Sequence, residues 1–214
     1  IADSEILHFT SFKKVLEPFM QDFTKERYFA EYLGLTDHDL FLQLIDEGKI
    51  KVGSNIVEEL IERKNRIFEE QATKEAPILP GVREFIEKLL KDDVPAAVCS
   101  GALRREIELI LEKAEMTGCF ELIISADDVV KGKPDPQCFE LTLKKLNEKN
   151  QSKIEPGQCV VIEDSHWGLE AAISAGMHTV AVTNSYPAEQ LEKAEKIVAS
   201  LSELITDDLQ MLCG

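Results

Sequence analysis

The sequence has few basic residues for its size and no long hydrophobic run. Of its 214 residues, 24 are Lys or Arg and 40 are Asp or Glu, which gives a formal net charge of -16. Such a surface repels nucleic acids and anionic membranes, and the one Arg pair, Arg104-Arg105, is too small to form a basic patch. No apolar stretch approaches the ~20 residues of a membrane span, and no leader opens the chain. We therefore expect a cytoplasmic protein that binds neither nucleic acid nor membrane.

The cysteines offer no obvious cross-linking or zinc pattern. There are five, an odd number, with no C-x-x-C pair, and most of them lie in apolar runs: Cys99, Cys119, Cys138, Cys159 and Cys213. The spacing favours buried free thiols in a reducing compartment over a disulfide framework or a zinc site.

The hydrophobic pattern divides the chain into two parts. At 44% hydrophobic residues, the chain can bury a core and fits either one domain with a large insertion or two modest domains. From Ser4 to Thr73 the apolar spacing is helical and predicts four or five helices and no strand. The segment from Ala76 to Gly81, which contains Pro77 and Pro80, marks a boundary between the two parts.

Beyond this boundary, helical patterns alternate with short apolar runs. The expected helices are 82–91, 103–115, 136–148 and 166–175, and the expected strands are 94–99, 120–125, 159–162, 178–182 and an edge strand near 197–199. This alternation predicts an α/β fold with a Rossmann-like parallel sheet covered on both faces. Functional sites in such sheets gather at the carboxyl ends of the strands.

An acidic pair, Glu163-Asp164, follows the expected strand 159–162 directly. Mg²⁺ takes one or two carboxylates, keeps several waters and completes its shell with phosphate oxygens, so the pair suits a magnesium site. The alternative is that Asp164 or Ser165 merely caps the helix that begins at His166. The preceding apolar strand favours the metal site, because a cation relieves the repulsion between two carboxylates at a sheet edge.

Lys133 stands in the segment Gly132-Lys133-Pro134-Asp135-Pro136. Pro134 favours extended backbone at Lys133, and Asp135 followed by Pro136 predicts a helix N-cap and a first helical residue. A lysine held there can neutralise a phosphoryl group and a carboxylate nucleophile together. The alternative is a solvated lysine beside a turn.

Ser100-Gly101-Ala102 follows the expected strand 94–99. The Ser100 hydroxyl and the backbone N–H groups of this turn can bind phosphate oxygens at the start of the next helix, although Ser-Gly turns are common. We expect Trp167 and the four histidines to be structural, because no two histidines have the spacing of metal ligands: His8, His38, His166 and His178.

Together, in this order, Ser100, the segment around Lys133 and Glu163-Asp164-Ser165 resemble the haloacid dehalogenase-like (HAD) hydrolase superfamily. More closely, the chain is similar to the branch that contains β-phosphoglucomutase and phosphoglycolate phosphatase. The resemblance implies an inserted α-helical cap at 4–77 and a HAD-like α/β core formed by 1–3 and 78–214. It also implies a small phosphorylated metabolite as partner and a monomer or weak dimer.

The same resemblance implies roles for individual residues. Ser100, Gly101 and Ala102 would bind the phosphoryl group, Lys133 would stabilise the charged nucleophile and the phosphate, and Asp164 with Glu163 would hold Mg²⁺. The family's nucleophile belongs to an Asp-x-Asp-Gly stretch on a first strand in the middle of the sheet, which this sequence lacks. Asp3 does not replace it, because Ile1-Ala2 is too short to form that strand. We therefore expect an incomplete N-terminus, a missing first core strand and an inert chain.

A Mg²⁺-dependent phosphatase acting through an aspartyl-phosphate is the function that the resemblance favours. A β-phosphoglucomutase-like phosphotransferase is the alternative, but the places of its basic residues carry Asp37 and Leu103 here. A non-catalytic binding module that has lost its nucleophile is a second alternative. A dehalogenase, which lacks the acidic pair, and a receiver domain, whose acidic pair comes early, fit the sequence poorly.

Overall fold

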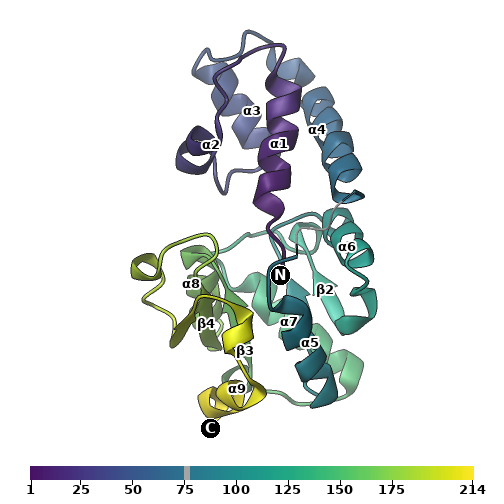
Figure 1. Ribbon diagram of the computed structural model, residues 1–214, viewed down its shortest axis with the longest axis vertical. Coiled ribbons are helices and arrows are strands. Elements are labelled where there is room, and N and C mark those ends of the chain that lie inside the picture. Colours follow the sequence, from purple (N-terminus) through teal and green to yellow (C-terminus); the bar gives the residue numbers. More distant parts are fainter. Residues whose placement is uncertain (75–77) are drawn as a thin grey trace. The chain divides into compact units, whose positions relative to one another are not determined.

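The structure, a computed structural model, describes residues 1–74 and 78–214, and the chain divides into two compact units (Figure 1). One unit spans Ala2–Pro77, and the other comprises Ile1 and Ile78–Gly214. Within the described ranges, no helix is both long enough and apolar enough to cross a membrane.

The first unit is helical, as the sequence predicts. Its helices are α1 (Ser4–Leu16), α2 (Lys25–Glu31), α3 (Asp37–Asp46) and α4 (Val57–Ala72), with a 3-10 turn at Ser54–Ile56. Two threonines define helix starts: the Thr24 side chain accepts a hydrogen bond from the Arg27 N–H group, and the Thr36 side chain accepts one from the Asp39 N–H group. Such caps satisfy amides that have no partner within the helix.

An aromatic cluster fills the core of this unit. The Phe12 ring lies 6.4 Å from Phe23, 6.1 Å from Tyr28 and 5.5 Å from Phe41, measured between ring centroids. All four side chains are buried. Because these residues come from α1, α2, α3 and the segment before α2, the cluster ties the helices together.

A lysine is also buried in this unit. Lys64 of α4 is 1% exposed, and its Nζ lies 2.8 Å from Oδ2 of Asp37. The same ammonium group faces the rings of Phe12 and Phe68, at 5.2 and 5.4 Å from their centroids. The ion pair and the ring contacts together compensate for the removal of this charge from water.

His8 of α1 packs against Phe68, with 4.6 Å between the ring centroids. Burial, assisted by the positive charge of Lys64, lowers the pKa of His8 to about 3. The imidazole is therefore neutral at physiological pH, which supports the structural role expected for it.

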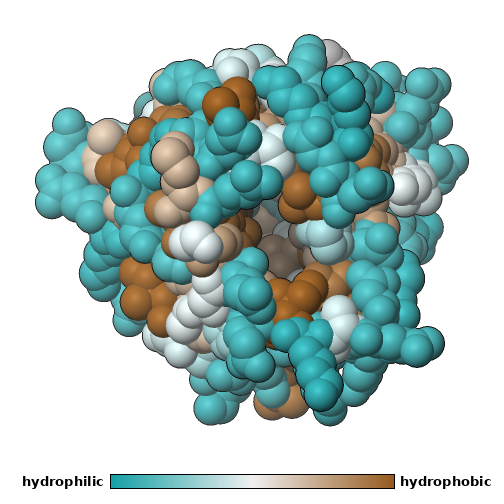
Figure 2. Space-filling model, turned by 90° about the horizontal axis from the view of Figure 1, so that it is seen from below, coloured by the Kyte–Doolittle hydropathy of each residue, from teal (hydrophilic) through white to brown (hydrophobic). Residues whose placement is uncertain are grey.

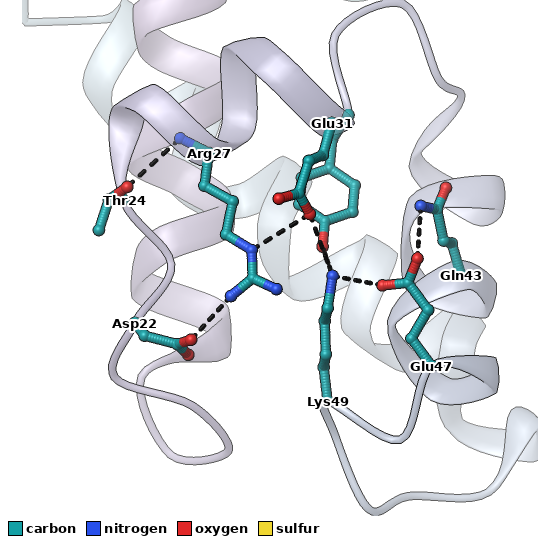
Figure 3. Close-up of polar contacts among 8 residues, drawn as sticks. Asp22, Thr24, Arg27, Glu31, Gln43, Glu47 and Lys49 are labelled. Atoms are coloured by element: carbon teal, nitrogen blue, oxygen red, sulfur yellow. Dashed lines mark hydrogen bonds and ion pairs between the residues drawn. The ribbon is translucent and has the colours of Figure 1, made fainter.

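A polar network links α2, α3 and the segment after α3 on the surface of the helical unit (Figure 3). Arg27 donates to Asp22 at 2.7 Å and to Glu31 at 3.2 Å. Lys49 donates to Glu31 at 3.0 Å and to the Tyr32 hydroxyl at 2.7 Å, and it also pairs with Glu47. Exposed ion pairs contribute little one by one, so we assign the network a modest structural role.

The second unit has the α/β order that the sequence predicts. Its strands are β1 (Ala97–Cys99), β2 (Leu122–Ile124), β3 (Val160–Glu163), β4 (His178–Val182) and β5 (Lys196–Val198). Its α-helices are α5 (Val82–Lys91), α6 (Arg104–Lys113), α7 (Gln137–Asn150), α8 (His166–Ser174) and α9 (Thr206–Cys213). Short 3-10 turns lie at Thr117–Cys119, Ala126–Asp128, Pro156–Gln158, Ala188–Gln190 and Leu201–Glu203.

The strands form two parallel sheets. One has the order β1-β2 and the other the order β3-β4-β5. The helix α7 packs against β1 and β2, and α8 packs against β3 and β4. A buried cluster that includes Ile124, Phe139, Ala171 and Ala172 joins these layers.

The edges of β1 and β3 are not joined by a strand in the described ranges. Every residue of β3 is only half-buried, although Val160, Val161 and Ile162 are apolar. Apolar surface therefore remains uncovered. On the face drawn in Figure 2, a hollow lies near the middle, and both hydrophobic and hydrophilic side chains border it.

Two details differ from the expectations, and a third agrees with them. The helix α9 was not expected from the sequence; its first-turn carboxylate Asp208 pairs with Lys196 of β5. The helix α7 begins at Gln137, so Pro136 and not Asp135 occupies the N-cap position; Asp135 still accepts a hydrogen bond from the Gln137 N–H group at 3.0 Å. All five cysteines are free thiols, as predicted, but only Cys138 is buried and the other four are half-buried.

The neutral state of His8 predicts a pH-dependent stability of the chain. Because folding lowers the His8 pKa from 6.5 to about 3, its contribution is complete above pH 6.5 and falls progressively as the pH drops towards 3. We expect the free energy of unfolding to fall by about 1.4 kcal/mol per pH unit more steeply in the wild type than in His8→Gln over this window. Urea titrations followed by far-ultraviolet circular dichroism measure both slopes, and equal slopes would contradict the burial of a neutral imidazole.

Candidate active site

Lys133 connects the carboxyl ends of the two sheets. Its Nζ donates a hydrogen bond to the carbonyl oxygen of Cys99, the last residue of β1, at 3.2 Å. The same Nζ forms an ion pair with Oε1 of Glu163, the last residue of β3. The two paired side chains are 17% and 10% exposed, respectively. The alternative of a solvated lysine beside a turn is therefore wrong.

The charge of Lys133 is maintained despite burial. Burial, the largest single influence, opposes the charged form, but the Glu163 carboxylate and other nearby groups outweigh it, so the pKa of Lys133 is raised. The loop between β2 and α7 carries the lysine, and the Lys133–Pro134 peptide bond is cis. The Nζ also lies 4.9 Å from the ring centroid of Phe139. The site thus has a permanent positive charge that is fixed in place.

Both carboxylate oxygens of Glu163 have hydrogen-bond partners. Lys133 contacts Oε1, and the Ser165 hydroxyl donates to Oε2 at 3.1 Å. The Ser165 oxygen also accepts a hydrogen bond from the Gly168 N–H group at 3.1 Å, so Ser165 is the N-cap of α8. The sequence left open that Asp164 or Ser165 caps this helix, and the structure shows that Ser165 does and Asp164 does not.

Gly168 provides the space that Glu163 needs. A Cβ atom placed on Gly168 would lie 2.1 Å from the Glu163 carboxyl carbon, far inside van der Waals contact. The first turn of α8 can therefore lie this close to the Glu163 carboxylate because residue 168 has no side chain.

Asp164 receives its partners from the segment after β4. The Ser185 hydroxyl donates to Oδ2 of Asp164 at 2.6 Å, and the Asn184 amide reaches the same oxygen at 3.5 Å. Neither residue was predicted from the sequence. Their position directly after an apolar strand was the available signal, because polar residues at strand ends converge at one edge of a parallel sheet.

The acidic pair fits a hard divalent cation with few protein ligands. Carboxylate oxygens are the donors that Mg²⁺ prefers, and one or two of them suffice when water and phosphate complete the shell. Because both oxygens of Glu163 already have partners, Asp164 is the better placed ligand of the two. Within the described ranges, no group of three or more His, Cys, Asp or Glu side chains is arranged to hold a metal.

The Ser100 turn lies next to the Lys133 contact. The Ser100 N–H group continues the β1-β2 ladder by donating to the Ile124 carbonyl at 2.9 Å, and the Ser100 oxygen accepts from the Ala102 N–H group at 3.1 Å. A Cβ placed on Gly101 would meet nothing within 4 Å, so this turn borders open space.

The expectation of a free helix start after this turn needs a correction. The helix α6 begins at Arg104, and its first amides already have carboxylate partners. The Leu103 N–H group donates to Glu106 at 3.2 Å, and the Arg104 N–H group donates to Asp127 at 2.8 Å. Phosphate recognition here would therefore rest on Ser100, Gly101 and Ala102, and not on the first turn of α6.

The structure thus brings together most of the predicted site. Lys133 and Glu163 are in direct contact, Asp164 follows Glu163, and Ser100 follows the Cys99 carbonyl that Lys133 binds. Their catalytic and metal-binding roles stay predictions. The tertiary contacts of Gly168, Asn184 and Ser185 complete the geometry.

Comparison with known proteins places this site in context. The sequence profile of the haloacid dehalogenase-like hydrolases matches residues 1–182. The chain is 29% identical over 181 residues to a phosphorylated carbohydrates phosphatase from Thermotoga maritima, a match that covers 84% of this chain and 79% of that protein. It is 27% identical over 209 residues to the β-phosphoglucomutase of Bacillus subtilis, which covers 95% and 87%, respectively.

A solved structure agrees with these matches. The crystal structure of β-phosphoglucomutase from Clostridium difficile has a TM-score of 0.80 to this structure at 23% sequence identity, and covers 100% of this chain and 92% of that one. This similarity shows the fold. The matches to two other curated relatives cover only 40% and 58% of the length of those proteins.

The close approach of Gly168 to Glu163 generates a prediction. Gly168→Ala should lower the free energy of unfolding by roughly 1–3 kcal/mol, because the added methyl group forces the Glu163 carboxylate or the start of α8 to move. Gly157→Ala is the control, since a Cβ there meets nothing within 4 Å. Chemical denaturation of both variants measures the difference, and equal stabilities would mean that Glu163 does not occupy the space beside Gly168.

Proposed function

The chain belongs to the haloacid dehalogenase-like hydrolase family, and from this premise we propose that it is a Mg²⁺-dependent phosphatase of small phosphomonoesters. The observation that supports this most directly is the position of Lys133 between the ends of β1 and β3, next to the acidic pair and Ser100. Phosphoryl transfer depends mainly on fixed charge and orientation around the transferred group, and this arrangement supplies both.

In the proposed reaction, the Ser100 hydroxyl and the Gly101-Ala102 turn bind phosphoryl oxygens. Lys133 stabilises the charge of the phosphate and of the carboxylate nucleophile. Asp164, with Glu163 beside it, would hold Mg²⁺, which when bound neutralises phosphoryl charge and orients the phosphate. Ser185 and Asn184 keep the Asp164 carboxylate in a fixed orientation. The nucleophile would be an aspartate that forms an aspartyl-phosphate, encoded before Ile1.

We propose a sugar phosphate as the substrate class. The name of the Thermotoga maritima relative specifies phosphorylated carbohydrates, and the match covers 79% of that protein. Such a substrate would bring at least one phosphate dianion into a protein of net charge -16, so local positive charge has to attract it.

A phosphotransferase like β-phosphoglucomutase is the second candidate, supported by the match to the Bacillus subtilis enzyme over 95% of this chain. A mutase must also bind a second phosphate group. In a β-phosphoglucomutase we expect a basic residue at position 37. Here this position is Asp37, which pairs with the buried Lys64. Because Lys64 and Asp37 balance each other's charge, the pair offers no net positive charge to a second phosphate, which favours the phosphatase.

The proposed nucleophile leads to a direct test. A protein that carries the residues encoded upstream of Ile1 should release phosphate from β-glucose 1-phosphate when Mg²⁺ is present, whereas the chain starting at Ile1 should be nearly inert. The reason is that Ser100 and Lys133 can stabilise charge but cannot form the aspartyl-phosphate. Assays of phosphate and of glucose 6-phosphate distinguish the candidates: rearranged sugar phosphate without phosphate release indicates a mutase. Equal turnover by both proteins would contradict the proposed nucleophile.

The role of Lys133 has its own test in the active protein. Lys133→Ala should lower kcat by a factor that corresponds to ~3 kcal/mol, as for the loss of one fixed charge stabiliser. Lys131→Ala is a matched control from the same loop, because the Lys131 side chain is 70% exposed and pairs with Asp135 at 3.1 Å, away from Glu163. Asp164→Ala should lower turnover and weaken its dependence on Mg²⁺ concentration. Unchanged kcat in Lys133→Ala would remove this lysine from the proposed mechanism.

A further inference from the structure

The turn Ala126–Asp128 lies between the Ser100 turn and the loop that carries Lys133. It follows β2, and the chain continues from it into that loop. The Ala126 N–H group donates a hydrogen bond to the Ala102 carbonyl oxygen at 3.0 Å. One short turn is therefore bonded to the segment that is proposed to bind phosphate and also begins the loop that carries the lysine.

The Asp128 carboxylate closes this turn. Its Oδ2 atom accepts hydrogen bonds from the Ser125 N–H group at 2.9 Å and from the Ser125 hydroxyl at 2.8 Å. Ser125 is fully buried, and the Asp128 side chain is 18% exposed. Removal of the carboxylate would leave buried donors of Ser125 without their acceptor, which is costly for the turn.

Arg104, at the start of α6, binds the same carboxylate. Its Nη2 lies 2.6 Å from Oδ2 of Asp128 and 2.9 Å from the carbonyl oxygen of Ile123 in β2. The Arg104 N–H group donates to Asp127 at 2.8 Å. Lys145 of α7 lies 3.6 Å from the other Asp128 oxygen. Asp128 thus links the start of α6, the end of β2 and α7.

The Asp128 carboxylate is charged at neutral pH. The hydrogen bond from the Ser125 N–H group is the largest influence on it, and together with the Ser125 hydroxyl and Arg104 it outweighs burial and holds the pKa of Asp128 well below its usual range. Hydrogen bonds to a charged acceptor are about twice as strong as those between neutral groups. The contacts of Asp128 are therefore suited to hold the surrounding backbone in one arrangement.

We propose that Asp128 is a positioning residue for phosphoryl transfer, which fixes the backbone of the Lys133 loop against the Ser100 turn. The inference rests on the proposed function, in which Ser100 and Lys133 act on one phosphoryl group. The Lys133 Nζ is bound by Glu163 and by the Cys99 carbonyl, but a lysine side chain is long and flexible, so its backbone must also be held. A displacement of about 1 Å in such a site can lower the rate ~100-fold.

Hydrogen exchange measured by mass spectrometry tests the link between the two segments and does not depend on any activity. Asp128→Ala should speed the exchange of backbone amides both at 101–104 and at 129–135, because the turn that joins them loses its central acceptor. Asp128→Asn keeps the shape of the side chain and one acceptor oxygen, so it should cause a smaller increase. It replaces the alanine variant if that variant fails to fold.

Glu108→Gln is the matched control for hydrogen exchange. Glu108 is a second carboxylate partner of Arg104, at 3.7 Å within α6, and its side chain is 56% exposed. Its replacement should leave the exchange of both segments unchanged, because it does not touch the turn. If Asp128→Ala speeds exchange at 125–128 alone, or in only one of the two segments, the proposal is overturned.

A double-mutant cycle with Lys133 tests the consequence for the reaction. In the protein that includes the residues encoded before Ile1, Asp128→Ala should lower kcat for p-nitrophenyl phosphate ~100-fold. In the Lys133→Ala background the same change should cost less than about threefold, because an absent lysine cannot be misplaced. A structural defect that merely reduces the fraction of folded enzyme would cost the same factor in both backgrounds, and that result overturns the positioning role.

The two measurements distinguish failure of this inference from failure of the proposed function. A preparation that lacks Mg²⁺-dependent phosphatase activity refutes the proposed function, and hydrogen exchange still decides whether Asp128 joins the two segments. Unchanged kcat in Asp128→Ala, in a preparation that is active as the wild type, removes Asp128 from the reaction and leaves the proposed function intact.

Discussion

The buried ion pair between Lys133 and Glu163 is the interaction on which the arrangement of the site depends. In the described ranges no strand joins β1 to β3, and this lysine reaches from the last carbonyl of one to the last side chain of the other. Replacing either partner alone leaves a charge in a largely buried position, which costs far more than the pair contributes. The segment that carries Lys133, the close Gly168 turn and the Ser165 cap all serve to keep the two charges together.

Much of the fold could be predicted because it follows from local patterns. The predicted helix at 82–91 and strand at 178–182 coincide with α5 and β4, since hydrophobic periodicity and flanking Gly or Pro residues define them within a few positions. The placement of Ser100 and of Glu163-Asp164 at strand ends also followed from order along the chain. The parallel-sheet rule then implied that they share one edge.

The finer structure of the site could not be predicted, because it consists of contacts between residues far apart in sequence. The sequence allowed either Ser165 or Asp164 as the cap of α8; in the structure Ser165 is the cap, and Asp164 instead accepts a hydrogen bond from Ser185, which follows β4. Likewise, Asp127 accepts the hydrogen bond of the Arg104 N–H group, so the amide that was expected to bind phosphate already has a partner. The one-residue shift at the start of α7 has a local origin instead, since Asp135 accepts a hydrogen bond from the Gln137 N–H group two residues further on.

The charge balance of the site explains why a metal belongs in the proposed function. Lys133 is the cation fixed between the two sheets, but Glu163 already neutralises it in the folded protein. A phosphate dianion that enters this edge would meet Asp164 and Glu163, which together outweigh the one lysine. In a protein of net charge -16, long-range attraction cannot make up the difference. A divalent cation at Asp164 reverses the local sign, so that substrate binding and metal binding should be mutually dependent, each strengthening the other by the same factor.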